Sequence, residues 1–130
     1  MAEKVKVSCL HCGATNNFPL DSAGKTVVCG RCRNALPVPG TVLELQEQAA
    51  TILIQRSGLH VLVDFYSPTC GPCLIMHPLV ERLAKRRAGE LMVIKVNTDN
   101  SPGLASRFGI QAVPTFVVIS KGTERGRTSG

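Results

Sequence analysis

Aromatic residues are scarce in this sequence, because its 130 residues include no tryptophan, one tyrosine and four phenylalanines. Proteins that bind single-stranded nucleic acid stack bases on aromatic side chains, so the sequence offers little material for a platform of that kind. Apolar runs such as 61–63 and 91–94 fall far short of the roughly 20 residues that span a membrane. Residues 1–6 alternate charge and precede no apolar stretch, which argues against a signal peptide and leaves a reducing cytoplasm as the expected location.

Charge is modest and dispersed along the chain. Charged residues make up 18% of the sequence and the formal net charge is +6. The densest basic cluster, 85–87, lies where we expect a helix to end, a place that the helix dipole favours for cations. The charge therefore indicates a solvated surface rather than a nucleic-acid footprint. The hydrophobic fraction of 44% supports a packed core and excludes wholesale disorder.

All six cysteines occur in C-x-x-C pairs, which are Cys9 with Cys12, Cys29 with Cys32, and Cys70 with Cys73. In a cytosolic protein such pairs indicate metal binding or redox chemistry. A link rich in proline and glycine, 35–40, separates the first two pairs from the third. We therefore expect a small module over residues 1–36 and a larger domain over residues 37–130. A chain as short as the small module rarely folds without a metal, a disulfide or a partner.

The first two pairs have the spacing C-x2-C-x16-C-x2-C, which is typical of a zinc site. The expected ligands are Cys9, Cys12, Cys29 and Cys32. Four thiolates complete the tetrahedron around one ion, so the expected zinc is structural. Gly13 and Gly30 give permissive backbone beside the ligands. Rubredoxin-type iron and two disulfides are the alternatives, and His11 is a less favoured ligand.

A zinc ion in this module has two further consequences. Four ligating thiolates and one divalent cation lower the net charge from +6 to about +4, which weakens the case for nucleic acid. Oxidation of the thiolates would release the metal and loosen the module.

Residues beyond the link alternate between helical and strand-like patterns. The expected helices are 46–56, 72–87 and 102–108, and the expected strands are 60–66, 91–96 and 115–119. The segment 42–45 is ambiguous between a short strand and the start of a helix. This alternation predicts an α/β fold with a partly parallel sheet.

The third cysteine pair follows an apolar strand directly and opens an amphipathic helix. Pro72 suits the first turn of a helix, where its missing N–H costs nothing. The free N–H groups and the dipole at the helix N-terminus favour the thiolate of Cys70, which is the nucleophilic form. Cys73 lies on the same helical face and can attack the mixed disulfide that Cys70 forms. An unpartnered metal knuckle or two packing cysteines would not account for this context.

Asp64 is an acidic residue inside the apolar run 61–66. If both faces of the strand are covered, burial raises the pKa of this carboxyl, and it can exchange a proton with Cys73. An edge strand or a solvated position would explain the residue equally well.

The segment 61–73, Val-Leu-Val-Asp-Phe-Tyr-Ser-Pro-Thr-Cys-Gly-Pro-Cys, resembles the active-site strand, loop and helix of the thioredoxin family. Segments 94–99 and 108–116 resemble the next thioredoxin strand and the segment that holds the family's cis-proline. The four-cysteine module makes the chain similar to the zinc-containing, second type of bacterial thioredoxin. The resemblance implies an α/β fold with a thioredoxin-like mixed sheet flanked by helices, preceded by a small zinc ribbon.

The resemblance also implies roles for individual residues. Cys70 is the attacking thiol, Cys73 the resolving thiol, and Asp64 the buried acid/base beneath Cys73. Lys95 matches the family lysine near that carboxylate, and Pro78 matches the proline that kinks the active-site helix. The residues expected to contact substrate are Thr69, Gly71, Pro72, Val113 and Pro114. Of these, Pro114 is the expected cis-proline and Val113 offers its backbone to an extended substrate strand.

Two features depart from the family pattern. Thr69 replaces the usual tryptophan before the first cysteine, and Tyr66 replaces another aromatic residue, so the rim of the dithiol is less apolar. Only residues 120–130 follow the last expected strand, enough for a turn and one short strand. We therefore expect the larger domain to lack the family's terminal helix and to expose apolar sheet surface. A truncated chain and a partner on that face would both explain this.

We expect a cytosolic protein-disulfide reductase that acts on disulfide-containing proteins. An external reductase of the thioredoxin-reductase type would restore it, without an organic cofactor or a membrane. The alternative is a zinc-dependent holdase or adaptor that binds extended peptides at the groove of Val113 and Pro114 without redox turnover. Nucleic-acid binding is the weakest hypothesis, because it rests only on basic residues of the small module. These are Lys4, Lys6, Lys25, Arg31 and Arg33.

Overall fold

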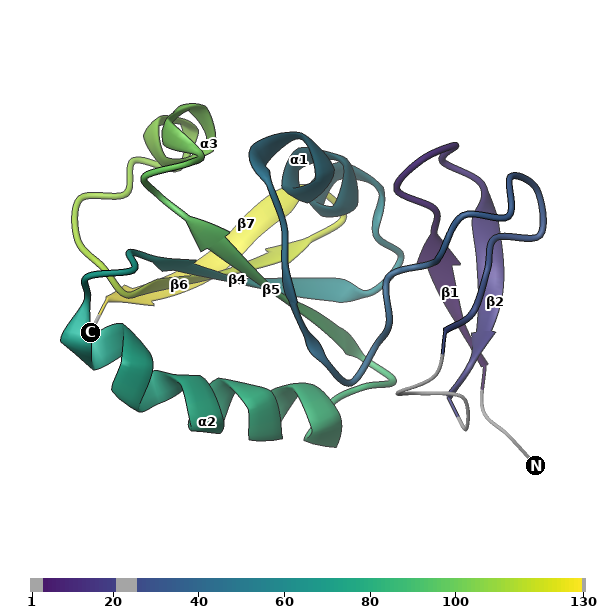
Figure 1. Cartoon of the computed structure of the whole chain (residues 1–130), viewed down its shortest axis with the longest axis horizontal. Coiled ribbons are helices and arrows are strands. Elements are labelled where there is room, and N and C mark those ends of the chain that lie inside the picture. The colour runs from purple at the N-terminus through teal and green to yellow at the C-terminus, as the bar shows by residue number, and fades with distance from the viewer. Residues whose placement is uncertain (1–3, 21–25, 130) are drawn as a thin grey trace.

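A five-stranded mixed sheet forms the centre of the larger domain, in the order β3-β5-β4-β6-β7 (Figure 1). Its strands are β3 (Val42–Glu44), β4 (His60–Tyr66), β5 (Leu91–Asn97), β6 (Thr115–Ser120) and β7 (Thr123–Ser129). Strand β5 pairs in parallel with β3 and β4, whereas β6 pairs antiparallel with β4 and β7. The computed structural model describes residues 4–20 and 26–129 of the chain.

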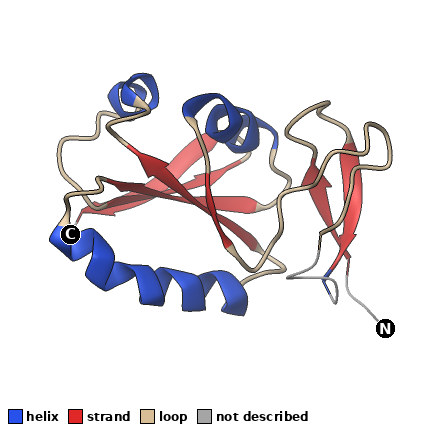
Figure 2. Cartoon of the chain, in the orientation of Figure 1, coloured by secondary structure: helices blue, strands red, loops and turns tan. Residues whose placement is uncertain are grey.

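Helices cover both faces of this sheet, as Figure 2 shows. Helices α1 (Glu47–Arg56) and α3 (Pro102–Arg107) lie on one face, and α2 (Gly71–Arg86) lies on the other. The expected fold class, a mixed sheet flanked by helices, is confirmed. None of the helices among the described residues is long and apolar enough to cross a membrane.

The main hydrophobic core lies between the sheet and the helices α1 and α3. Its buried residues are Ala50, Leu53, Ile54, Val61, Val63, Phe65, Met92, Ile94, Val96, Leu104, Val117 and Ile119. On the opposite face, Leu62 and Val93 from the sheet pack against Val80 and Ala84 of α2. Strand β4 is buried from Val61 onward because both of its faces are covered.

The expected elements agree closely with the structure. The ambiguous segment 42–45 forms the edge strand β3, and β7 follows a turn after β6. Pro78 lies inside α2 without ending it, so the expectation that the helix continues past this proline, based on its apolar spacing, is confirmed.

The small module contains a hairpin that the sequence did not predict, formed by β1 (Lys4–Ser8) and β2 (Thr15–Pro19). Each strand has only five residues and few large apolar side chains, so its periodicity is weak. Its small core holds Val7 and Phe18 with two cysteines, and Leu36 and Val38 join it from the two sides of the expected boundary.

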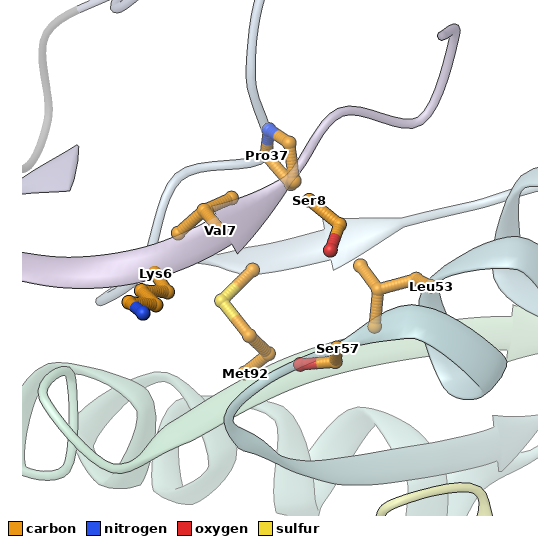
Figure 3. Close-up of a pocket in the computed structure, with 7 residues that line it drawn as sticks. All are labelled: Lys6, Val7, Ser8, Pro37, Leu53, Ser57 and Met92. Carbon is orange, nitrogen blue, oxygen red and sulfur yellow. The ribbon is translucent and has the colours of Figure 1, made fainter. Parts of the chain in front are cut away.

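The small module docks against α1 and β5 (Figure 3). Lys6, Val7 and Ser8 of β1 face Leu53 of α1 and Met92 of β5 across a narrow gap. The Ser8 hydroxyl donates a hydrogen bond of 2.8 Å to the backbone oxygen of Arg56, the last residue of α1. Leu10, from the first cysteine loop, packs on the main core.

Candidate active site and metal centre

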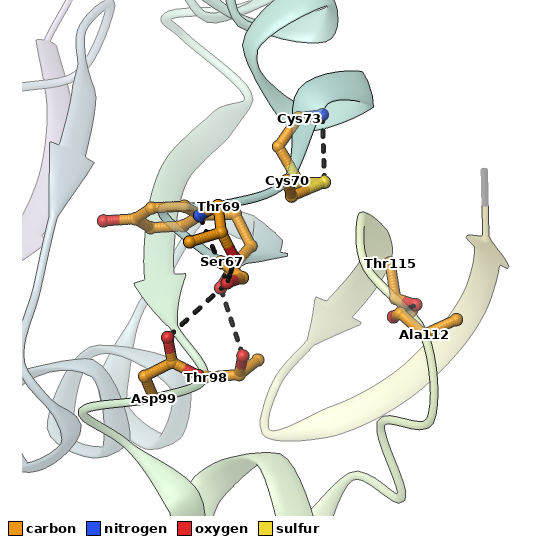
Figure 4. The surroundings of a disulfide bond; sticks show 9 residues. Ser67, Thr69, Cys70, Cys73, Thr98, Asp99, Ala112 and Thr115 are labelled. Carbon is orange, nitrogen blue, oxygen red and sulfur yellow. Dashed lines mark hydrogen bonds between the residues drawn. A yellow bond between two sulfur atoms is a disulfide. The ribbon is translucent and has the colours of Figure 1, made fainter.

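Cys70 is the N-cap of α2, at the point where β4 gives way to the helix. Its Sγ accepts a hydrogen bond of 3.1 Å from the N–H of Cys73, and the two sulfur atoms form a disulfide bond (Figure 4). Pro72 occupies the first turn of α2. Because an N–H and a helix N-terminus both point at Cys70 Sγ, the thiolate form is favoured there when the disulfide is reduced.

Hydrogen bonds hold the loop that precedes Cys70 (Figure 4). The hydroxyl of Ser67 lies 3.1 Å from that of Thr69 and 3.5 Å from a carboxylate oxygen of Asp99. The N–H of Thr98 donates to the backbone oxygen of Tyr66 at 2.9 Å. The loop is thereby tied to the residues that follow β5, and the Thr69 hydroxyl is engaged within it.

The peptide bond between Val113 and Pro114 is cis, as the resemblance implies. Val113 packs against the cluster formed by Tyr66, Cys70 and Cys73, so the structure brings these distant segments together. Around them, three expected substrate-contact residues are exposed, namely Thr69, Gly71 and Pro72. Two apolar side chains next to Cys73 are also strongly exposed, Leu74 at 71% and Ile75 at 76%.

Asp64 is buried in β4, with 2% of its surface exposed. Burial raises the pKa of its carboxyl to about 6, although the nearby Lys95 and His77 lower it. Its Oδ1 has no hydrogen-bond partner among the described residues. The strand that leads to Cys70 thus contains a carboxyl whose pKa is raised by burial.

Lys95 lies directly opposite Asp64 on β5. Its ammonium group stands 4.2 Å above the centre of the Tyr66 ring, and no ion pair among the described residues joins it to Asp64. Sequence patterns missed two neighbours of this group. Glu44 accepts a hydrogen bond from the Tyr66 hydroxyl, and His77 of α2 contacts Glu81 at 2.6 Å. Neither Glu44 nor His77 belongs to a sequence motif. Glu44 meets Tyr66 only through the strand order, and His77 meets Glu81 one helical turn further on.

The four cysteines of the small module converge on one point. Their sulfur atoms all lie within 4.8 Å of one another, with Cys9 and Cys32 at 3.5 Å and Cys12 and Cys29 at 3.6 Å. A tetrahedral ion with metal–sulfur bonds of about 2.3 Å places its ligand atoms about 3.8 Å apart. The residues present therefore fit a tetrahedral ion with four thiolate ligands.

Amide groups surround these sulfur atoms, as a thiolate centre requires. The backbone N–H groups of His11 and Arg31 donate to Cys9 and Cys29, each at 3.4 Å. Two side-chain amides complete the shell: Asn16 donates to Cys29 at 3.4 Å and Asn34 to Cys32 at 3.3 Å. The sequence analysis missed both asparagines, although each lies close to a C-x-x-C pair.

The cysteine loops close differently from expectation. Gly13 ends the first loop with a φ of 78°, as a permissive residue should. In the second loop the positive φ of 68° belongs to Arg33, and Gly30 has no such conformation. In both loops the residue with positive φ directly follows the second cysteine of the pair. Counting one residue on from Cys32 would have identified Arg33, whereas the search for glycines pointed to Gly30.

The basic residues of the small module are spread over different elements. Lys4 and Lys6 lie on β1, whereas Arg31 and Arg33 lie on the second cysteine loop. Lys25 lies outside the described residues.

Known proteins are similar to this chain both in sequence and in fold. A sequence model of the family described as Thioredoxin matches residues 41–130. Thioredoxin C-3 from Corynebacterium nephridii is 36% identical over 124 residues, which are 95% of this chain and 84% of that protein.

Two solved structures resemble the chain over most of the larger domain. A mutant thioredoxin from Halobacterium salinarum NRC-1 gives a TM-score of 0.64 at 32% identity, covering 71% of this chain and 80% of that one. The structure titled as a complex of ferredoxin:thioredoxin reductase and thioredoxin f2 gives a TM-score of 0.67 at 23% identity, covering 71% of this chain and 84% of that one. The second likeness concerns the fold alone.

Proposed function

This chain belongs to the thioredoxin family, and on that premise we propose that it reduces protein disulfides with Cys70 as the attacking and Cys73 as the resolving thiol. Its activity as a thiol-disulfide oxidoreductase follows from the family. The roles of the two sulfur atoms are our assignment. One observation carries it: the sulfur of Cys70 caps α2 and accepts the N–H of Cys73, within a disulfide of sequence separation 3.

The proposed exchange has two balanced steps. The Cys70 thiolate attacks one sulfur of the substrate disulfide, so a bond forms between Cys70 and that sulfur while the other substrate sulfur leaves as a thiolate. The thiolate of Cys73 then attacks Cys70, which closes the disulfide seen here and releases the second substrate thiol. Two electrons pass to the substrate, and an external dithiol donor must return them.

Asp64 is the proposed acid/base of this cycle, and Lys95 tunes it. Cys73 must lose a proton before it attacks, and a carboxyl with a pKa near 6 can take that proton at neutral pH. The Lys95 charge favours the carboxylate, so it opposes the effect of burial. Asp64 lies on β4, the strand that leads to the dithiol, and Lys95 lies opposite it on the parallel neighbour β5.

The proposed substrate groove runs between the dithiol loop and the cis-proline segment. Thr69, Gly71 and Pro72 form one edge and are exposed, whereas the half-buried Val113 and the buried Pro114 form the other. An extended peptide beside Val113 can form main-chain hydrogen bonds, which bind many sequences with little dependence on side chains.

We propose that residues 1–36 are a zinc module and residues 37–130 the redox domain. Zinc fits because four sulfur atoms converge at tetrahedral spacing and amide donors surround them. Bound zinc would cross-link the two cysteine loops and supply folding energy, and it leaves no open coordination position for catalysis.

A reductase of the thioredoxin-reductase type is the proposed electron donor, and disulfide-containing proteins are the proposed substrates. The neighbour at 23% identity is titled as a complex of ferredoxin:thioredoxin reductase with thioredoxin f2, so a related fold binds a reductase there. Four metal-binding thiols persist best in a reducing compartment, so we retain the cytoplasm as the proposed location.

Trapping of the mixed disulfide tests the thiol assignment. Cys73→Ser, once reduced, should accumulate a covalent complex with disulfide-containing substrates, because nothing resolves the bond to Cys70. Cys70→Ser should form none, and both variants should lose insulin reduction driven by dithiothreitol. A complex trapped only in Cys70→Ser would reverse the two roles.

A second candidate is peptide binding without redox turnover. The exposed side chains of Leu74 and Ile75 beside the groove favour it, since contiguous apolar surface marks interaction sites. A variant with both active-site cysteines changed to serine separates the two candidates. If it still suppresses aggregation of an unfolded protein at wild-type levels, binding is independent of exchange.

A further inference from the structure

Three neighbouring strands place charged residues in one row on the α2 face of the sheet. Glu44 of β3 lies opposite Lys95 of β5, which lies opposite Asp64 of β4. Residues in register on adjacent strands project from the same face. The proposed acid/base therefore stands in an acid–base–acid row whose outer member, Glu44, belongs to no motif.

Tyr66 connects this row to the dithiol. Its hydroxyl donates a hydrogen bond of 2.5 Å to Glu44, and the Lys95 ammonium stands over its ring. The same ring is buried against Cys70 and Cys73. One side chain thus contacts the outer carboxylate, the cation and the reacting pair.

We propose that Glu44 is a positioning residue for disulfide exchange: its hydrogen bond holds the Tyr66 ring, and through it the Lys95 ammonium, in place beside Asp64. This inference rests on the proposed role of Asp64 as acid/base. Glu44 is exposed, so solvent screens its charge and its direct effect on Asp64 is small. Its effect passes through the ring, because a cation over an aromatic face stays there only while the ring keeps its orientation.

Charged or titratable groups near Asp64 come from β5 and α2, whereas β6 places the uncharged Phe116 opposite it. Lys95 of β5 and His77 of α2 favour the carboxylate, and Tyr66 shares its own strand. Burial and then the hydrogen bond to Glu44 raise the pKa of Tyr66 to about 12, so the phenol stays a donor throughout the working range. Loss of the Glu44 contact would free the ring and let Lys95 move into solvent.

The pH profile of insulin reduction tests this arrangement. The proposed role of Asp64 predicts a rising limb that depends on deprotonation of this carboxyl, so a displaced Lys95 should move the limb to higher pH. Glu44→Ala and Tyr66→Phe should each move it by about half a unit, less than the roughly 1–3 units of a directly paired charge, because Lys95 forms no ion pair with Asp64 among the described residues. The double variant should move it no further, since both changes remove one contact.

Matched variants separate positioning from charge and from damage to the fold. Glu44→Gln keeps an acceptor oxygen without the charge, so it should restore most of the wild-type profile. Glu90→Gln makes the same change in charge at the far end of the domain and should leave the limb in place. A shift to lower pH in Glu44→Ala would mean that Glu44 competes for Lys95 through charge, and would overturn the proposal.

The variant Asp64→Asn distinguishes a failure of the proposed acid/base role from a failure of the positioning role of Glu44. A limb that is unchanged in Asp64→Asn overturns the acid/base role and this inference with it. A limb that changes there, but stays fixed in Glu44→Ala and Tyr66→Phe, overturns the inference alone.

Absorbance of the phenolate provides an independent measurement, because Tyr66 is the only tyrosine and the chain has no tryptophan. Its pKa should fall in Glu44→Ala toward the ordinary value of about 10. An unchanged pKa would show that the contact with Glu44 does not exist in solution, and would overturn the proposal.

Discussion

At the scale of single residues, Asp64 carries the largest electrostatic cost in the larger domain. A buried carboxylate without a complete set of hydrogen bonds destabilises the fold. Its pKa of about 6, against an ordinary value of 3.8, means that the folded state holds the proton more strongly than the unfolded state does. A residue with this cost is best explained by its chemistry.

Asp64→Asn should therefore stabilise the protein at neutral pH. The pKa shift of about 2 units corresponds to about 3 kcal/mol in the free energy of unfolding. The asparagine amide also costs free energy to bury, so the net gain should be about 1–3 kcal/mol. Because the folded pKa is raised, the part of the wild-type stability that depends on protonated Asp64 is fully present below about pH 4 and is lost as the pH rises through about 6. Urea unfolding from pH 3 to pH 8 measures this.

The gain in Asp64→Asn should vanish at pH 3, where the wild-type carboxyl is protonated in both states. Asp99→Asn, an exposed change in the turn that follows β5, is the control and should show no such pH dependence. A gain that is equal at pH 3 and pH 7 would mean that packing, and not ionisation, sets the difference.

At the scale of elements, the two cysteine loops have the same backbone hydrogen bonds but different residues at the closing position. Gly13 donates its N–H to the oxygen of Cys9 at 3.0 Å, and Arg33 donates to that of Cys29 at 3.0 Å. Both closing residues have positive φ, which costs a non-glycine residue about 1–2 kcal/mol. The second loop therefore carries strain that the first avoids.

Arg33→Gly should stabilise the small module by about 0.5–1 kcal/mol, since glycine adopts positive φ freely but is more flexible when unfolded. Arg33→Ala removes the same charge and keeps the strain, so it should give no gain. The urea midpoint for zinc release, followed with a chromogenic chelator, measures both. Equal gains in the two variants would assign the effect to charge.

The first loop should respond in the opposite direction. A Cβ at Gly13 would overlap the guanidinium group of Arg56, which crosses the glycine from the end of α1. Gly13→Ala should therefore destabilise the module by about 1–2 kcal/mol from backbone strain and also displace Arg56. In an Arg56→Ala background the overlap is gone, so the loss caused by Gly13→Ala there, measured against Arg56→Ala alone, should be the backbone cost. The absence of a loss in that background would show that the overlap with Arg56, and not backbone strain, sets the cost.

At the scale of the whole molecule, a small thiolate-centred core is attached to a larger apolar one. Reduced native protein should contain one zinc ion per chain and two thiols that react with Ellman's reagent, Cys70 and Cys73. Denaturation with a chelator should raise the reactive thiols to six, the number in the sequence. Six reactive thiols in native, metal-free protein that retains its circular dichroism would exclude the zinc assignment.

Much of this architecture could be predicted because it is written in short-range patterns. The C-x-x-C spacing identified both cysteine groups, and the apolar periods identified the helices and strands of the larger domain. The hairpin β1–β2 escaped because two five-residue strands with few large apolar side chains give no clear period. Glu44 escaped for another reason: its partner Tyr66 is 22 residues away, and only the order of the strands brings them together.

The packing of Tyr66 against the disulfide has an optical consequence. Without tryptophan, the near-ultraviolet fluorescence of this protein comes almost entirely from that one phenol, and a disulfide in contact quenches an excited aromatic ring. Opening the bond between Cys70 and Cys73 should therefore brighten the emission near 305 nm. The protein thus carries its own unlabelled reporter, with which each turnover can be followed in a stopped-flow fluorimeter.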